Sequence, residues 1–92
     1  MTNEQGTVYV LHFNRPFKHA RHYVGWAKNP EARIEHHRQG TGARLMQVVR
    51  EAGIDFVVAN LMPGTRSDER RWKNRGSAAR YCSICKAEKA AA

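Results

Sequence analysis

Long hydrophobic stretches are missing from this 92-residue sequence, and none approaches the ~20 apolar residues that a membrane-spanning helix needs. The first residues, Met1 to Gly6, also lack the basic segment and the apolar core of a secretory signal peptide. Only two cysteines occur, which excludes the disulfide-rich class of small secreted scaffolds. These absences predict a cytoplasmic protein that has no membrane partner.

Acidic residues are scarce as well. Eight Asp and Glu stand against 16 Lys and Arg, so the net charge is +8 and the pI is near 10.2. Such an excess favours a polyanionic partner, because each Lys or Arg placed against a phosphate releases condensed counterions. The basic residues are spread over the whole chain instead of forming one amphipathic face, which disfavours binding to a membrane surface.

The length allows one small domain, and its high surface-to-volume ratio makes that domain marginal unless something staples it. We expect a flexible N-terminus over residues 1–6, a folded domain over 7–78, and a tail over 79–92 that carries both cysteines. Nothing in the sequence specifies the oligomeric state.

Alternating and β-branched residues predict three strands, at residues 7–13, 22–27 and 54–61. Helical signals predict three helices, at 30–38, at 43–51, and from Ser67 or Asp68 to near Gly76. Asn29 can cap the first of them and Pro30 suits its first turn. We expect residues 14–17 and 62–65 to be turn and loop, and Val57, Val58 and Leu61 to be buried. The order predicts an α/β fold: a small three-stranded, mostly antiparallel sheet flanked by helices.

Five short motifs follow one another along these elements. Two of them carry tyrosines in strands, Thr7-Val8-Tyr9 and Tyr23-Val24-Gly25. The others are the helix segment 29–37, the Gly-x-Gly-Ala segment 40–43, and the third strand followed by the segment 67–73. Together they resemble the GIY-YIG nuclease superfamily, in particular its small stand-alone members, over roughly residues 7–76. Thr7 stands where that family has glycine, and Gly6 lies one place earlier.

This resemblance implies a GIY-YIG-like fold and a metal-dependent endonuclease that hydrolyses phosphodiester bonds in DNA, including branched or damaged duplexes. It implies one Mg²⁺ or Mn²⁺ ion held by Glu69. The catalytic residues that it implies are Tyr9, Tyr23, Arg33, His37 and Glu69. His37 is preferred because it lies four residues after Arg33, and His36 is the alternative.

The same side chains suit phosphodiester chemistry on their own terms. One carboxylate such as Glu69 is enough for a magnesium ion, which keeps most of its waters. Arg33 offers a planar, permanently charged fork for phosphate oxygens. Taken singly, however, Tyr9 and Tyr23 are more often a cross-strand packing pair. Five basic residues are expected to contact backbone phosphates: Lys18, Arg21, Lys28, Arg38 and Arg44.

Cys82 and Cys85 form a single Cys-x-x-Cys motif in an expected turn near the end of the chain. A structural zinc site needs four ligands, and this motif supplies half of them. The missing ligands could come from His12, His19 or His22, or from a second chain, and two free thiols are an equally acceptable interpretation.

Two other functions remain open on the sequence. One is a nucleic-acid-binding module of the same fold without catalysis, which the altered first motif and the charge of +8 favour. The other is a zinc-stapled interaction module built around Cys82 and Cys85. Trp26 and Trp72 are expected to pack in or near the core instead of stacking on bases.

Overall fold

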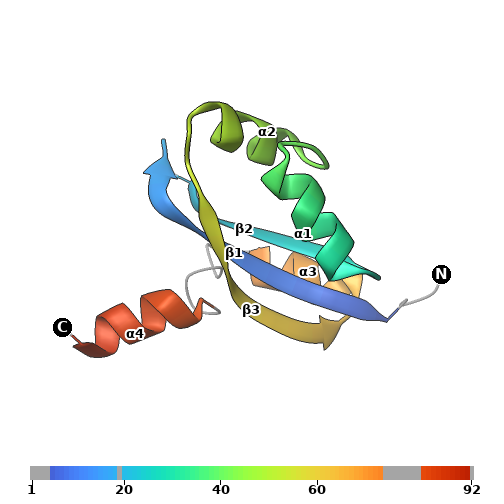
Figure 1. Ribbon diagram of the computed structural model, residues 1–92. Coiled ribbons are helices and arrows are strands. Elements are labelled where there is room, and N and C mark those ends of the chain that lie inside the picture. The colour runs from blue at the N-terminus through green and yellow to red at the C-terminus, as the bar shows by residue number, and fades with distance from the viewer. Residues whose placement is uncertain (1–4, 19, 74–81, 92) are drawn as a thin grey trace.

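The computed structural model describes residues 5–18, 20–73 and 82–91. Its strands are β1 (Gly6–Phe17), β2 (Ala20–Ala27) and β3 (Phe56–Gly64), which form one antiparallel sheet in the order β2-β1-β3. Its helices are α1 (Pro30–Arg38), α2 (Arg44–Glu51), α3 (Arg66–Lys73) and α4 (Ser83–Ala91). The predicted α/β fold with a small antiparallel sheet is confirmed, and α4 is an addition to it (Figure 1).

The sheet separates two hydrophobic cores, because successive side chains of a strand point to opposite faces. Tyr9, Leu11 and Phe13 of β1 pack on one face against residues of α1 and α2. Val8 and Val10 pack on the other face, with residues of β2, α3 and the start of α4. This second core contains Val24, Trp26, Ala59, Trp72 and Cys82. Both tryptophans are buried, as expected.

Local sequence signals define two of the helix starts. The side-chain oxygen of Asn29 accepts a hydrogen bond from the Ala32 amide, and Pro30 opens α1 as predicted. The start of α3 lies slightly earlier than predicted. Thr65 and Asp68 bond reciprocally there, side chain to backbone amide, as in a capping box. The described helices are short, and none is long and apolar enough to cross a membrane.

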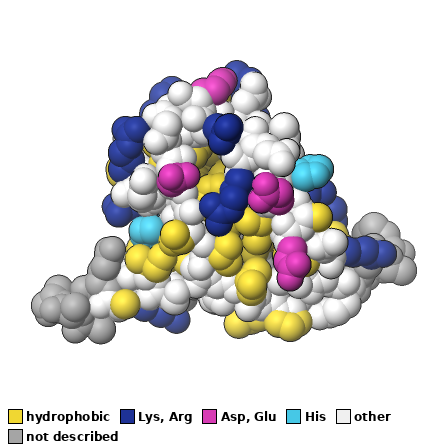
Figure 2. Space-filling model, in the orientation of Figure 1, with side chains coloured by type: hydrophobic (Ala, Val, Ile, Leu, Met, Phe, Trp, Pro, Cys, Tyr) yellow, Lys and Arg dark blue, Asp and Glu magenta, His cyan; other side chains and the backbone are white. Residues whose placement is uncertain are grey.

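The third strand departs from the prediction. It begins at Phe56 and continues through Met62 to Gly64, so the expected loop at 62–65 is wrong. Val57, Val58 and Leu61 were expected to be buried, but they are 50%, 37% and 54% exposed. A continuous apolar run is typical of a strand covered on both faces, whereas β3 lies at the edge of the sheet. Hydrophobic side chains gather on the surface along its course (Figure 2).

Two irregularities shape the sheet. Between β1 and β3 the register shifts, because Val10 pairs with Asn60 while Leu11 pairs with Val58, a β-bulge that leaves Ala59 between them. At the hairpin, Phe17 pairs with Ala20, so the strand extends through the residues expected to form a turn. The register between Tyr9 and Gly25 is regular, and it positions the functional residues.

Gly25 is required by the Tyr9 ring, which lies across its backbone. A Cβ built on Gly25 would approach the Cζ and Oη atoms of Tyr9 to 2.4 Å, too close for any side chain. We expect Gly25→Ala to destabilise the protein by about 1–3 kcal/mol through overpacking and to displace Tyr9. Urea unfolding measures the loss. Ala27→Gly is the control, because Ala27 lies on β2 with Gly25 and the substitution changes the stability of the strand without touching Tyr9. Gly53→Ala is unsuitable as a control because Gly53 has a positive φ.

Candidate active site and metal centre

Tyr9 and His37 form a buried hydrogen-bonded pair at the centre of the molecule. The Tyr9 hydroxyl lies 2.9 Å from Nε2 of His37, and each side chain is only 1% exposed. Tyr9 comes from the central strand β1, and His37 comes from the buried side of α1. The Tyr23 ring completes the cluster, edge-on to His37 with 5.0 Å between ring centroids. Three predicted catalytic side chains are therefore in contact.

The loop after α1 fixes the orientation of the imidazole. Nδ1 of His37 lies 3.2 Å from the carbonyl oxygen of Thr41, which can only accept a hydrogen bond. Nδ1 therefore carries the proton, and Nε2 accepts the hydrogen bond that the Tyr9 hydroxyl donates. Gly42, with φ +91°, lets the loop come this close, since an added Cβ would lie 3.2 Å from the imidazole. The Gly-x-Gly segment thus positions His37.

Burial keeps both partners of this pair neutral near pH 7. It raises the pKa of Tyr9 above its usual 10.0, with a further contribution from Tyr23. Burial also lowers the pKa of His37 below its usual 6.5, although the hydrogen bond to Thr41 acts in the opposite direction. A neutral imidazole with a free lone pair on Nε2 is a proton acceptor for the Tyr9 hydroxyl.

Two charged side chains from different helices act on Tyr9. Arg33, one turn before His37 on α1, lowers the pKa of Tyr9, whereas the Glu69 carboxylate raises it. Glu69 belongs to α3, whose Trp72 packs in the other core. Glu69 is also ion-paired with Lys73 at 3.1 Å, and the Lys73 ammonium lies 5.7 Å from the centroid of the Tyr23 ring.

The surroundings of Glu69 indicate whether its carboxylate could bind magnesium. Its side chain is only 16% exposed, and Asp68 next to it is occupied by Thr65 and Arg71. This leaves one half-buried carboxylate near the Tyr9–His37 pair. A single carboxylate suits Mg²⁺ or Mn²⁺, since magnesium keeps several waters and takes one or two carboxylates. It does not suit an ion that needs all of its ligands from the protein.

The five basic residues predicted to bind phosphates lie in different environments. Lys28 lines a groove beside α1, together with Arg33 and His36. Arg44 lies at the start of α2 and donates to Gln47. Lys18 lies over the Phe17 ring, and Arg21 donates to the carbonyl of Phe13. The phosphate-binding role of all five stays a prediction. His36 is exposed and does not join the Tyr9–His37 pair.

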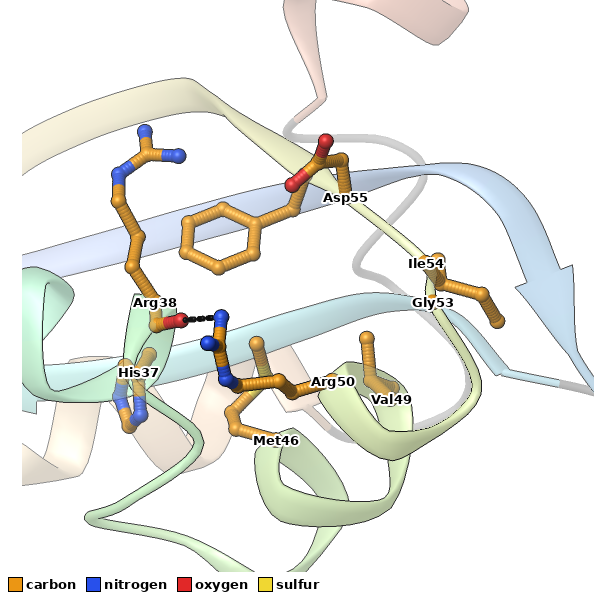
Figure 3. Close-up of a pocket in the computed structure, with 9 residues that line it drawn as sticks. His37, Arg38, Met46, Val49, Arg50, Gly53, Ile54 and Asp55 are labelled. Carbon is orange, nitrogen blue, oxygen red and sulfur yellow. Dashed lines mark hydrogen bonds between the residues drawn. The ribbon is translucent and has the colours of Figure 1, made fainter.

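A separate pocket of about 210 Å³ lies between α1, α2 and the start of β3, with His37 at its edge (Figure 3). Arg50 points across it and donates a hydrogen bond of 2.7 Å to the carbonyl oxygen of Arg38. The Arg38 guanidinium in turn lies 4.6 Å from the centroid of the Phe56 ring. These contacts tie α1 to α2 and β3, so both arginines have structural roles here.

A second group of candidate site residues lies on the other face of the sheet. His12 of β1 and His22 of β2 are direct cross-strand partners, and Cys82 and Cys85 flank the start of α4. Cys82 caps this helix, because its sulfur accepts a hydrogen bond from the Cys85 amide. Cys85 therefore lies in the first helical turn and not in an isolated Cys-x-x-Cys turn as predicted.

The potential ligand atoms of these four residues all lie within 4.8 Å of one another. Nδ1 of His12 is 3.3 Å from Nε2 of His22, and 3.3 and 3.7 Å from the two sulfurs. Nε2 of His22 is 3.2 Å from the Cys85 sulfur. One ring nitrogen makes a single hydrogen bond, so three ligand atoms around it indicate convergence on a common point. This group could hold a metal ion.

His12 and His22 were two of three histidines considered as partners of the cysteines, and the structure brings both of them to the site. The third, His19, lies outside the described residues. One basic residue of the groove beside α1 was missed altogether: Arg66, whose guanidinium lies 4.5 Å from the centroid of the Trp26 ring. Nothing in the sequence around Arg66 distinguishes it from the other arginines of its helix.

Comparison of the chain with family models, with curated proteins and with solved structures finds no match. The functional argument therefore depends on the geometry of the two sites and on the residues that form them.

Proposed function

We propose that this protein is a GIY-YIG-type endonuclease domain that hydrolyses phosphodiester bonds in DNA with a divalent metal ion. The observation that carries the proposal is the buried Tyr9–His37 hydrogen bond, with Arg33 and Glu69 close enough to shift the pKa of Tyr9. A net charge of +8 supports a polyanionic substrate. Buried titratable groups that interact with one another are typical of functional sites.

In the proposed reaction, Tyr9 takes a proton from the attacking water while its own proton passes to Nε2 of His37. The water oxygen forms the new bond to phosphorus, the bond to the leaving sugar oxygen breaks, and that oxygen takes a proton from solvent. Thr41 stabilises the resulting imidazolium, because its carbonyl oxygen already accepts the Nδ1 proton. This relay avoids a free Tyr9 phenolate, which the raised pKa of Tyr9 disfavours.

Arg33 and Glu69 have complementary tasks in this proposal. Arg33 would hold non-bridging phosphate oxygens, where its fixed charge opposes the negative charge that gathers in the transition state. Glu69 would hold Mg²⁺ or Mn²⁺, which supplies Lewis-acid stabilisation of the phosphate when bound. Tyr23 packs edge-on against His37 and keeps the imidazole in line with Tyr9.

The role of Glu69 is tested with Glu69→Gln, which preserves the shape of the side chain. We expect cleavage of plasmid and branched DNA with Mg²⁺ or Mn²⁺ to fall by at least about a hundredfold, because a catalytic ion supplies several kcal/mol. Glu35→Gln is the matched control, since Glu35 is exposed and its side chain accepts a hydrogen bond from Gln39 on the same side of α1. If wild type and Glu69→Gln cleave equally, Glu69 is not the metal ligand.

A second candidate function is nucleic-acid binding without catalysis. The Glu69–Lys73 ion pair at 3.1 Å favours it, because the ammonium occupies the carboxylate that a metal would need. This alternative predicts DNA binding that weakens steeply with salt, together with no metal-dependent product from the wild-type protein. The cleavage assay on wild type therefore separates the two functions.

We further propose that His12, His22, Cys82 and Cys85 bind a zinc ion. Tetrahedral zinc with bonds of about 2.0 Å to nitrogen and 2.3 Å to sulfur separates its ligand atoms by roughly 3.3 to 3.8 Å. Four of the six separations between ligand atoms are 3.2 to 3.7 Å and agree with these edges, and all six are within 4.8 Å. Two nitrogens and two sulfurs are a typical zinc donor set.

Four protein ligands would close the coordination sphere, which is the mark of a structural zinc site. The group also lies on the face of the sheet opposite to Tyr9, since His12 is three residues further along β1. We therefore assign zinc the role of a staple that joins the β1–β2 hairpin to α4, separate from the ion at Glu69. Elemental analysis of protein purified without chelators should find zinc in stoichiometric amount.

A further inference from the structure

An open groove of about 570 Å³ runs beside the candidate active site. Its walls are the end of β2, the exposed side of α1 and the first residue of α3. Small residues such as Ala27, Ala32 and Gly42 lie along it, so a polymer backbone can approach closely. The groove is open to solvent and is not an enclosed cavity for a small molecule.

Its charge is of one sign. Lys28, Arg33 and Arg66 line the groove, and none of the described residues that line it is a carboxylate. Among the residues that the structure describes, neither Arg33 nor Arg66 has an ion-pair partner, whereas Arg71 on the same helix as Arg66 binds Asp68 at 2.8 Å. Uncompensated positive charge along a groove concentrates anions there.

Base recognition has little support in this groove. The Trp26 ring is only 8% exposed, and the Arg66 guanidinium lies over it at 4.5 Å, so the ring offers no free face for stacking. The side-chain oxygen of Asn29 is used by the Ala32 amide at the start of α1. What remains is a row of cations, which suits phosphates and not base edges.

The groove also passes close to the Tyr9–His37 pair, because two of its lining residues, Gly42 and Arg33, are neighbours of His37. A Cβ on Gly42 would lie 3.2 Å from the His37 ring and 3.6 Å from Cδ of Arg33, so the three residues are neighbours. Arg33 lines the groove and also lowers the pKa of Tyr9. A phosphate held by Arg33 would thus lie at one end of the groove, with further phosphates of the same strand along it.

We propose that this groove binds the sugar–phosphate backbone of a DNA strand that leads into the candidate active site, without reading its sequence. Lys28 and Arg66 bind phosphates beyond the one held by Arg33. This inference rests on the proposed nuclease function and deepens it. It also distinguishes these residues from Lys18, Arg21 and Arg38, which do not line the groove.

Arg66→Ala and Arg71→Ala form a matched pair for the test. Both remove one exposed charge from α3, but only Arg66 lines the groove. The affinity of each variant for a fluorescently labelled short DNA duplex is measured at several salt concentrations, in buffer without divalent metal. We expect Arg66→Ala to weaken binding roughly fivefold near physiological salt and to reduce the slope of log K against log salt by about one.

Arg71→Ala should leave both quantities unchanged, and Lys28→Ala should behave as Arg66→Ala does. Equal effects of Arg66→Ala and Arg71→Ala would overturn the proposal, because they would reflect net charge alone. An unchanged salt slope in Arg66→Ala would overturn it as well. The binding assay does not depend on cleavage. If binding depends on the groove residues but the wild-type protein never cleaves DNA, the proposed nuclease function fails while the proposed DNA-binding groove stands.

Discussion

Removal of zinc is expected to lower the free energy of unfolding by several kcal/mol, which is a large part of the ~5–15 kcal/mol available to a small domain. A chelator that binds zinc but not magnesium should release about one equivalent of zinc and lower the midpoint of thermal unfolding. The reason lies in the second core, where the buried Cys82 packs beside Val10 and Trp72. Without an ion, two imidazoles and two thiols would remain packed together within 4.8 Å of one another.

Variants of the ligands separate metal binding from general damage. Cys85→Ser removes one ligand at a half-buried position, and Lys86→Ala changes the exposed neighbouring residue of α4 as the control. We expect Cys85→Ser alone to lose stoichiometric zinc and the stabilisation that added zinc provides. Cobalt(II) substitution gives a readout that does not depend on stability, since thiolate ligation produces an intense charge-transfer absorption. Retention of zinc by Cys85→Ser, or a thermal midpoint insensitive to chelation, would contradict the assignment.

A bound zinc ion would also explain how so short a chain can form a stable fold. Ninety-two residues bury little surface, and β3 leaves several large hydrophobic side chains exposed at the sheet edge. A metal that joins the hairpin to the last helix adds a long-range connection that apolar packing alone does not supply. The first strand and the last helix would thereby be tied together, since His12 and Cys82 lie 70 residues apart in the sequence and 3.3 Å apart in the structure.

Local chemistry made much of the fold predictable. Asn29 and Pro30 mark the start of α1 by mechanisms that involve only neighbouring residues, and the structure confirms that boundary. Alternating and β-branched residues likewise marked the strands. The exposure of Val57 and Leu61 was not predictable in this way. Whether an apolar strand is central or at an edge depends on strand order, which is a property of the whole chain.

The candidate sites were even less predictable from local sequence than the strands and helices. In an antiparallel hairpin, the pairing of Tyr9 with Gly25 requires His12 to face His22 three residues further along. The histidine half of the metal group therefore follows from one correct register, which the sequence alone does not fix. The approach of Cys82 and Cys85 depends on how the last helix packs, and Arg66 joins the groove only because α3 begins beside Trp26.

The Tyr9–His37 relay predicts a loss of cleavage without a loss of DNA binding. Tyr9→Phe keeps the ring over Gly25 and removes only the hydroxyl that donates to His37. We expect the rate of metal-dependent cleavage at saturating DNA to fall about 10²–10⁴-fold, the range typical of a lost general base. Affinity for DNA should change little, because the groove cations are untouched. Stability should fall by about 1–3 kcal/mol, since Nε2 of His37 loses its partner.

The pH profile identifies the proton acceptor. His37 accepts a proton only when it is neutral, and burial lowers its pKa below 6.5. Activity should therefore be full at neutral pH and decline as the pH falls below 6.5 through that lowered pKa. Stability should decline in the same direction, because the unfolded chain, with its histidine at the ordinary pKa, binds the proton first. Circular dichroism at each pH distinguishes loss of activity from unfolding.

His37→Gln supplies the decisive comparison. Gln can still accept a hydrogen bond from Tyr9, but it cannot take up a proton in this pH range. The variant should cleave slowly, and its activity should not show the decline below pH 6.5 that the wild type shows. Its stability should also not fall there, so the difference in stability between wild type and variant should shrink below pH 6.5, where the unfolded wild-type chain takes up a proton at His37. An acidic limb that persists unchanged in His37→Gln would exclude His37 as the acceptor. The proton would then have to leave Tyr9 by another route, with His36 as the nearest histidine in the sequence.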